Sequence, residues 1–341
     1  MDMQEKTKIG VLGAGTWGIA LARLLANAGH DVLVWSAIEK EIDVLSSTRI
    51  HPNLPGVELP EQLAYTKDIE EVCKDKDILL FAVPSVFVRA TARKASPYVV
   101  DGQIIVDVAK GIEGDTLFTM SEIIAEEMKD SAVKIVALSG PTHAEEVVKD
   151  LPTTIISACE DIDVAEKVQK VFNTGRMRVY TNTDIRGVEL CGALKNIIAL
   201  ASGIATGLGC GDNARAALIT RGIAEIGRLG NAMGCNGQTF SGLAGIGDII
   251  VTATSIHSRN NRCGMLIGQG IPVEEATKQV GMVVEGLNAL PAAMRLAEKY
   301  DVEMPIVETV DAVVSGRVDV QNAIAHLMSR ELKSEIIDSN N

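Results

Sequence analysis

Aromatic side chains make up only 3% of this 341-residue sequence, and acidic residues outnumber basic ones, giving a formal net charge of −13. Few aromatic rings leave little surface on which nucleobases could stack, and a negative surface repels polyanions. We therefore expect neither nucleic acid nor an anionic membrane as a partner. A small local pocket of positive charge for an anionic metabolite is compatible with this composition.

Neither the cysteines nor the histidines form a pattern typical of disulfide frameworks or metal sites. The five histidines are isolated, and the six cysteines include no C-x-x-C pair, lying at Cys73, Cys159, Cys191, Cys210, Cys235 and Cys263. We expect reduced thiols, a cytoplasmic location and no bound metal. No secretory leader precedes the first predicted strand, and charges interrupt each apolar run before about 18 residues, so we expect no stable membrane insertion.

The strongest pattern in the sequence lies near its start. A short apolar segment, Ile9 to Leu12, leads into Gly13, Gly15 and Gly18, and an apolar helical run follows to Ala28. Strand, G-x-G-x-x-G turn and helix in this order predict a dinucleotide site, with the pyrophosphate at the helix N-terminus. The alternative is a plain tight turn between a strand and a helix.

The next strand, Val32 to Trp35, should end in a residue that selects the cofactor. An acid there would bind the ribose hydroxyls of NAD, and a base would bind the 2′-phosphate of NADP. Residues 36–38 are uncharged, and Glu39 and Lys40 follow them. The choice between NAD and NADP therefore stays open.

Strand and helix patterns alternate eight times up to about residue 182, and strand patterns disappear after Thr183. The length and the 47% apolar content favour two domains. We predict a doubly wound, Rossmann-type α/β sheet over residues 1–183 and an all-α C-terminal domain over residues 184–335. One long helix is expected from Asp184 to about Leu208, and the tail 338–341 is expected to be frayed.

Two further strand ends in the first half carry candidate site residues. Lys110 follows the predicted strand Ile104 to Val108, where it would point into the ligand crevice unless it is an ordinary loop lysine. Gly140 and Thr142 follow the strand at 134–138, and Thr142 is a candidate N-cap for the next helix. A helix is also predicted from Thr116 to Met128.

Four polar residues stand out in the apolar second half. Lys195 and Asn196 lie within an apolar helix, and a buried lysine there would be an acid/base group with a lowered pKa, unless it reaches the surface. Asp248 lies in an otherwise apolar helix start, where it could be only an N-cap, and Thr252 would share its face one turn on.

A polar stretch, Ser258 to Arg262, contains Ser258, Arg259 and Asn260 and leads into a predicted helix at 262. Arginine side chains and helix-start amides suit a phosphate, although an ordinary polar loop would have the same composition. The segment Val283 to Gly286 includes Glu285, to which the residues alone assign no role.

With these residues in view, the sequence resembles the bacterial NAD(P)-dependent glycerol-3-phosphate dehydrogenases over nearly its whole length. The resemblance rests on GAGTWG at 13–18, SGPTHAEE at 139–146, VELCGALKNIIA at 188–199, NARAALITRGIAEIGRLG at 213–230, LAGIGD at 243–248, SRNNRCG at 258–264 and VVEG at 283–286. Family members often carry a base where Ser36 and Ala37 stand, and often read SRNRR where Asn261 interrupts.

The resemblance implies reversible hydride transfer between NAD(P)H and dihydroxyacetone phosphate, giving sn-glycerol 3-phosphate for phospholipid synthesis. It implies Lys195 as proton donor and acceptor. Implied substrate contacts are Lys110, Gly140, Thr142, Lys195, Asn196, Asp248, Thr252, Ser258, Arg259 and Asn260. Implied cofactor contacts are Gly13, Gly15, Thr16, Trp17, Gly18, Lys110, Ala144, Arg259, Val283 and Glu285.

Two other functions would fit parts of the same pattern. A 3-hydroxyacid dehydrogenase would also have a catalytic lysine, usually with an asparagine one helical turn later, whereas Asn196 is adjacent here. A non-catalytic nucleotide sensor would keep the glycine turn but would not need Lys195 and Asp248. The partner expected from the sequence is a small phosphorylated molecule, and a homodimer is compatible with the many small residues of the helical half.

Overall fold

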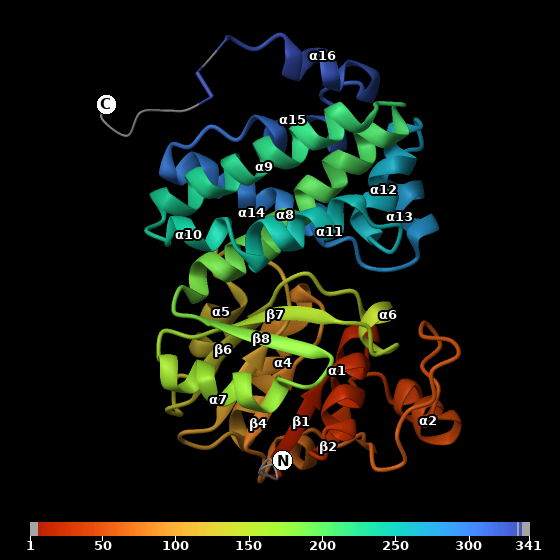
Figure 1. Cartoon of the computed structure of the whole chain (residues 1–341), viewed down its shortest axis with the longest axis vertical. Helices are drawn as coiled ribbons and strands as arrows, with labels where there is room; N and C mark the ends of the chain where they lie inside the picture. Colours follow the sequence, from red (N-terminus) through yellow and green to blue (C-terminus); the bar gives the residue numbers. More distant parts are fainter. Residues whose placement is uncertain (1–5, 333, 336–341) are drawn as a thin grey trace.

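The N-terminal half of the computed structural model, which describes residues 6–332, 334 and 335, is built on eight strands (Figure 1). They are β1 (Lys8–Leu12), β2 (Asp31–Trp35), β3 (Ala64–Thr66), β4 (Ile78–Phe81), β5 (Ile104–Asp107), β6 (Lys134–Ser139), β7 (Thr153–Ala158) and β8 (Met177–Asn182). The tail at 338–341, predicted to be frayed, lies outside the described residues.

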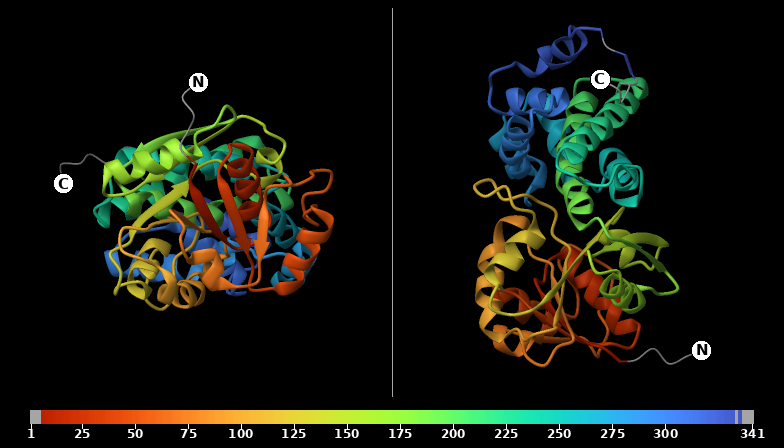
Figure 2. Two further views of the ribbon diagram at one scale, coloured as in Figure 1. Left: turned by 90° about the horizontal axis from the view of Figure 1, so that it is seen from below. Right: turned by 90° about the vertical axis from the view of Figure 1, so that its left-hand side faces the viewer.

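These strands form one sheet in the order β3-β2-β1-β4-β5-β6-β7-β8. Every neighbouring pair is parallel except β6 and β7, which are antiparallel. The predicted doubly wound sheet is confirmed, with one antiparallel pair that the alternation of strands and helices could not reveal. Because β1, β4, β5 and β6 run in the same direction, their carboxyl ends meet at one edge, which faces the helical domain (Figure 2, right).

Helices cover both faces of the sheet, as buried parallel strands require. The helices of this domain are α1 (Thr16–Asn27), α2 (Glu39–Thr48), α3 (Ile69–Cys73), α4 (Val88–Ala95), α5 (Met120–Glu127), α6 (Ala144–Val147) and α7 (Ile162–Phe172). Side chains of α1, α2, α6 and α7 share one apolar core with the sheet, and those of α3, α4 and α5 share the other.

The second half is helical throughout its described part, as predicted. Its helices are α8 (Ile185–Gly207), α9 (Asp212–Ala232), α10 (Gly237–Phe240), α11 (Asp248–Thr254), α12 (Arg259–Gly268), α13 (Val273–Val280), α14 (Glu285–Tyr300), α15 (Pro305–Val314) and α16 (Ala323–Met328). Helix α8 lies at the centre, and α9, α11, α12 and α14 pack around it (Figure 1). It is long and apolar enough to cross a membrane, but its whole apolar window is buried inside this domain.

The structure corrects two predicted helix starts. The helix expected from Thr116 begins only at Met120, because Thr119 and Glu122 form a capping box and Leu117 has a positive φ of 63°. Thr142 is not an N-cap, since His143 precedes α6 and the Thr142 hydroxyl bonds back to the carbonyl of Gly140.

The segment from 240 to 254, whose apolar pattern predicts one helix, is also interrupted. A five-residue π-helical turn, Leu243–Gly247, precedes α11. Gly245 lies within it, where a Cβ would overlap the carbonyl of Phe240, so the turn needs glycine at that position. The turn places Asp248 at the start of α11 rather than in the middle of a longer helix.

Helices α8 and α12 touch through their backbones. A Cβ on Gly264 would overlap the carbonyl oxygen of Leu200, and one on Gly203 would overlap the carbonyl oxygen of Asn261. Only glycine permits so close a crossing. The start of α12, which carries the predicted phosphate-binding residues, is thereby held against α8.

We predict that Gly264→Ala lowers the free energy of unfolding by about 1–3 kcal/mol, because the added methyl group forces the two helices apart. Thermal unfolding followed by circular dichroism measures the change. Gly227→Ala is the matched control within a helix, since its nearest neighbour would be Phe240 at 4.0 Å. An unchanged midpoint for Gly264→Ala would contradict the backbone contact.

A buried carboxylate in this domain makes stability depend on pH. Glu225 of α9 accepts hydrogen bonds from the amide of Ile306 at 2.9 and 3.1 Å, at the start of α15. Burial raises the pKa of Glu225 to about 7 from 4.5. The folded protein therefore binds this proton more tightly than the unfolded chain, and the resulting stability is present below the unfolded pKa and lost as the pH rises through the folded pKa.

We predict that Glu225→Gln, which keeps the acceptor oxygen and cannot ionise, loses less stability than the wild type between about pH 5 and pH 7. Thermal midpoints measured across this range test the difference. Glu274→Gln, an exposed acid on α13, should keep the wild-type slope. The same slope in Glu225→Gln would show that this carboxyl is not buried as described.

Candidate active site

A buried lysine of α8 lies at the centre of the polar contacts between the two domains. The Nζ of Lys195, a residue only 5% exposed, donates to the Oδ1 of Asp248 at 2.5 Å and to the Oγ1 of Thr252 at 2.8 Å. Thr252 in turn donates to the backbone carbonyl of Asp248 at 2.6 Å. Asp248 and Thr252 share one face of α11, as their spacing predicts, and together they orient the amine of Lys195.

The other oxygen of Asp248 binds a second lysine, from the sheet domain. The Nζ of Lys110 donates to Asp248 Oδ2 at 2.7 Å, and Asp248 itself is fully buried. The carboxylate of Asp248 does not cap its helix, because the N-cap of α11 is Gly247. One carboxylate between two ammonium groups joins the end of β5 to the helical domain.

This arrangement lowers the pKa of Lys195 to about 7 from 10.5. Burial is the largest cause, the positive charge of Lys110 also lowers the pKa, and the carboxylate of Asp248 opposes both. The amine can therefore both give and take a proton near neutral pH, as an acid/base group must.

Lys110 is held at the carboxyl edge of the sheet by further contacts. Its Nζ donates to the carbonyl of Gly140 at 3.1 Å and lies 3.5 Å from the Oγ1 of Thr142. Gly192 of α8 gives its aliphatic stem room, because a Cβ there would lie 3.4 Å from Lys110 Cγ. The structure thus brings Lys110, Gly140 and Thr142 together beside Lys195, as the sequence predicts from the strand ends.

The stretch at 258–262 begins helix α12 earlier than predicted, at Arg259. Ser258 is its N-cap and accepts a hydrogen bond from the amide of Asn261 at 3.2 Å. Asn260 donates to Asn196 Oδ1 at 2.9 Å and accepts from the amide of Gly286 at 2.8 Å. The amides of Asn196 and Asn260 therefore join α8, α12 and the start of α14.

Arg259 is the first residue of α12. Its side chain is half-buried and makes no hydrogen bond or ion pair with the described residues. Free amides at the start of α12 lie next to it in the chain. A guanidinium group without a protein anion beside a helix N-terminus can bind an external one.

The glycine turn after β1 has the shape that a pyrophosphate site needs. Gly13 has a φ of 122°, and a Cβ there would lie 2.7 Å from the carbonyl of Ala82, while a Cβ on Gly18 would overlap the carbonyl of Gly13. Gly15 is the N-cap of α1, and a Cβ there would meet no protein atom within 4 Å. Protein atoms pack tightly against Gly13 and Gly18, whereas the space beside Gly15 and the start of α1 at Thr16 is free. The pyrophosphate of a dinucleotide fits this arrangement.

The remaining predicted cofactor residues lie on several elements. Trp17 is half-buried in the first turn of α1, Ala144 is the buried first residue of α6, and Val283 is half-buried just before α14. At the end of β2, Ser36 donates to Glu41 Oε2 at 2.6 Å. The carboxylate of Glu41 thus reaches back to the strand end from α2, which the sequence pattern did not indicate.

Glu285, to which the residues alone assigned no role, joins the two domains. Its carboxylate accepts hydrogen bonds from the amide of Ser85 at 3.1 Å and from its hydroxyl at 2.6 Å. Ser85 follows β4 at the carboxyl edge of the sheet. Sequence reasoning missed Ser85, although its place after Pro84 at a strand end was a usable signal.

Within residues 6–332, 334 and 335, no three side chains of histidine, cysteine, aspartate or glutamate are grouped so as to hold an ion. All six cysteines are free thiols.

A dinucleotide-type sheet joined to a helical domain that supplies a buried lysine defines a class, the two-domain nicotinamide-dependent oxidoreductases. Within this class, the chain belongs to the NAD-dependent glycerol-3-phosphate dehydrogenase family. The family's N-terminal domain matches residues 8–165, and its C-terminal domain matches residues 184–325.

Relatives are similar over almost the whole chain. Glycerol-3-phosphate dehydrogenase (NAD(P)+) 2 of Lactobacillus delbrueckii subsp. bulgaricus is 65% identical over 333 residues, which cover 96% of this chain and 99% of that protein. Glycerol-3-phosphate dehydrogenase (NAD(P)+) of Bacillus subtilis is 48% identical over 97% of this chain and 96% of its own length.

Solved structures agree with the fold. The crystal structure of glycerol-3-phosphate dehydrogenase from Coxiella burnetii has a TM-score of 0.91 at 36% identity, covering 95% of this chain and 99% of that one. The 3-hydroxyisobutyrate dehydrogenase of Mycobacterium tuberculosis, at 14% identity and a TM-score of 0.53, shares the fold alone.

We predict that Gly15→Val weakens NADH binding by about tenfold or more, because its side chain would occupy the space left for the pyrophosphate. Isothermal titration calorimetry measures the affinity. Folding should be little affected, since a Cβ at this position would meet no protein atom within 4 Å. Gly18→Ala is the comparison, and it should lower the melting temperature instead. Wild-type affinity in Gly15→Val would place the dinucleotide elsewhere.

Proposed function

We propose that this protein catalyses reversible hydride transfer between NAD(P)H and dihydroxyacetone phosphate, with sn-glycerol 3-phosphate as the product. The observation that carries the proposal is the buried Lys195–Asp248–Lys110 cluster at the carboxyl edge of the dinucleotide sheet. The 65% identity to a glycerol-3-phosphate dehydrogenase supports the choice of substrate. The product would enter phospholipid synthesis in the cytoplasm, and a homodimer would be compatible with these roles.

The proposed cofactor site combines the glycine turn with residues from both domains. Gly13, Gly15 and Gly18 shape the turn, and the side chains and backbone near the nucleotide come from Thr16, Trp17, Lys110, Ala144, Arg259, Val283 and Glu285. When bound, the nicotinamide supplies the hydride. The contact of Glu285 with Ser85 fixes the start of α14 against the sheet domain, on the side where the nicotinamide would lie.

Lys195 supplies the proton in this proposal. As the carbonyl oxygen of the ketone becomes an alkoxide, the Nζ of Lys195 donates a proton to it, and in the reverse direction it takes the proton back. A pKa of about 7 makes both directions accessible at neutral pH. Asp248 and Thr252 fix the orientation of the Lys195 amine through their hydrogen bonds, so that Lys195 need not rearrange for the proton transfer.

Arg259 and the start of α12 would bind the phosphate group of the substrate. The Arg259 side chain has no partner within the described residues. The backbone N–H groups of the first turn of α12 point out of the N-terminal end of the helix, beside Arg259. Ser258, Asn196 and Asn260 hold that end in place, and Lys110, Gly140 and Thr142 would contact the rest of the substrate. A cationic site of this kind admits a dianion despite the net charge of −13.

We predict that Lys195→Ala lowers kcat for reduction of dihydroxyacetone phosphate by about a hundredfold or more, because the proton donor is lost. Absorbance at 340 nm follows the reaction with either NADH or NADPH. Lys299→Ala, an exposed lysine of α14, is the control and should match the wild type. Turnover of Lys195→Ala within a few-fold of the wild type would contradict the assignment, and activity of the wild type on 3-hydroxy acids alone would contradict the proposed substrate.

A further inference from the structure

The loop that follows β5 carries Lys110 at its start and runs to the cap of α5 at Thr119. It extends from the sheet domain towards α14 (Figure 2, right). Gly111 is packed so tightly that a Cβ would overlap the Cβ of Ser85. Beyond Gly111, the loop closes on itself, since the amide of Glu113 donates to the carbonyl of Phe118 at 2.9 Å and Leu117 donates back to Glu113 at 2.9 Å.

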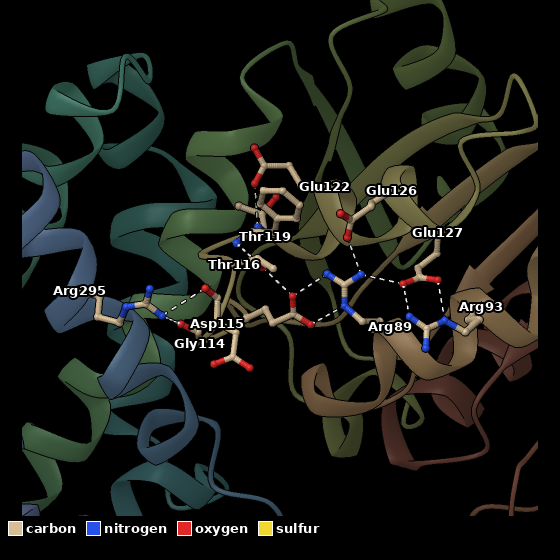
Figure 3. A network of polar contacts seen from close by, with 12 residues as sticks. Arg89, Arg93, Gly114, Asp115, Thr116, Thr119, Glu122, Glu126, Glu127 and Arg295 are labelled. Carbon is tan, nitrogen blue, oxygen red and sulfur yellow. Dashed lines mark hydrogen bonds and ion pairs between the residues drawn. The ribbon is translucent and has the colours of Figure 1, made fainter.

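A bidentate ion pair ties this loop to the sheet domain (Figure 3). The Nε and Nη2 of Arg89, on α4, donate to the two carboxylate oxygens of Glu113 at 2.7 and 2.6 Å. Thr116 also donates to Glu113 at 2.6 Å. The third nitrogen of Arg89 reaches Glu126 and Glu127 on α5, at 2.5 and 2.7 Å. The guanidinium is thus fixed from both sides, and its side chain is 24% exposed.

A second arginine holds the same loop from the helical domain. Arg295 of α14 donates to the backbone carbonyls of Gly114 and Asp115 (Figure 3). Glu285, at the start of the same helix, bonds Ser85 beside Gly111. Helix α14 therefore bonds the loop directly at Gly114 and Asp115, and it also bonds Ser85, which is packed against the base of the loop at Gly111.

We propose that Arg89 and Arg295 are positioning residues, which fix the loop behind Lys110 and so keep the Lys110 amine on Asp248 inside the substrate site. The proposal rests on the proposed function. Neither arginine touches the reacting atoms, and each acts through the loop. A bidentate arginine–carboxylate pair fixes direction as well as distance, which a loop with glycines at 111 and 114 cannot do alone.

The position of Lys110 matters for the proton step. Its ammonium group takes one oxygen of Asp248, which Lys195 would otherwise share, and its charge lowers the pKa of Lys195. If Lys110 withdraws, Lys195 loses a like charge and gains a larger share of the carboxylate. Both changes raise the pKa of Lys195, so the fixed loop keeps that pKa near 7.

The test compares Arg89→Gln with Arg93→Gln. Arg93 is one turn further along α4, bonds only Glu127 among the described residues and is 68% exposed in its side chain. For Arg89→Gln we expect the KM for dihydroxyacetone phosphate to rise by about tenfold, with a smaller loss of kcat. The Kd of glycerol 3-phosphate, measured by calorimetry without cofactor, should rise in parallel.

A pH profile separates positioning from a purely structural role. The midpoint of kcat/KM for glycerol 3-phosphate oxidation reports the deprotonation of Lys195. It should move to higher pH in Arg89→Gln, in the same direction as in Lys110→Met, which gives the full effect of losing the ammonium group. Arg295→Gln should shift the pH midpoint less than Arg89→Gln does, and Lys299→Gln is the control for this variant. Arg89→Lys should have a midpoint between those of Arg89→Gln and the wild type.

The results that would overturn the proposal are specific. It fails if Arg89→Gln has a lower melting temperature than Arg93→Gln but the same KM, Kd and pH midpoint. Should Arg89→Gln not fold, Glu113→Gln removes the charge of the pair at the loop itself and must show the same three changes. A wild-type protein inactive on dihydroxyacetone phosphate would instead overturn the proposed function, whereas an active wild type with unresponsive variants overturns only the role of the arginines.

Discussion

The contact on which this structure depends is a single buried carboxylate between two amines. Asp248 is fully buried and binds Lys195 at 2.5 Å and Lys110 at 2.7 Å, from different domains. An isolated charge in that place would cost several kcal/mol, and the two ammonium groups offset the cost only while both stay in position. The geometry of the domain boundary is therefore tied to the chemistry of the site, because the same ion pairs serve both.

The rest of the fold brings these three groups together and limits their movement. Parallel strands place Lys110 at the edge of the sheet, the π-helical turn places Asp248 at the start of α11, and α8 places Lys195 in the centre of the helical domain. Burial then lowers the pKa of Lys195 to about 7. In this way the packing of apolar helices determines the protonation of one polar group.

Much of this could be predicted from the sequence, because the relevant signals are local. The glycine turn and the lysine inside the apolar segment around 195 are each visible in a short stretch of sequence, and each strand or helix is indicated by the periodicity of its own residues. The start of α5 was misplaced although the capping-box pair, Thr119 and Glu122, was present, so this error was avoidable. Thr142 was mistaken for an N-cap because a hydroxyl before a helix does not reveal which residue has the extended backbone.

Contacts between distant segments could not be predicted in this way. Ser85 and Glu285 are 200 positions apart, and nothing in either segment indicates the other. The same holds for Arg89 with Glu113 and for Arg295 with the loop at 114–115, since charged surface residues have many potential partners. The antiparallel pairing of β6 and β7 could not be predicted either, because the direction of a strand depends on the path of the connection and not on the residues of the strand.

The backbone contact of α8 with α12 has a consequence for substrate length. Lys195 lies on the first helix and Arg259 begins the second, and the glycines at 203 and 264 allow neither helix to slide outwards without losing the contact. The spacing between the backbones of Lys195 and Arg259 is therefore set by main-chain packing. In the proposed function, where Lys195 meets the ketone oxygen and Arg259 the phosphate, this backbone spacing would favour substrates of one chain length.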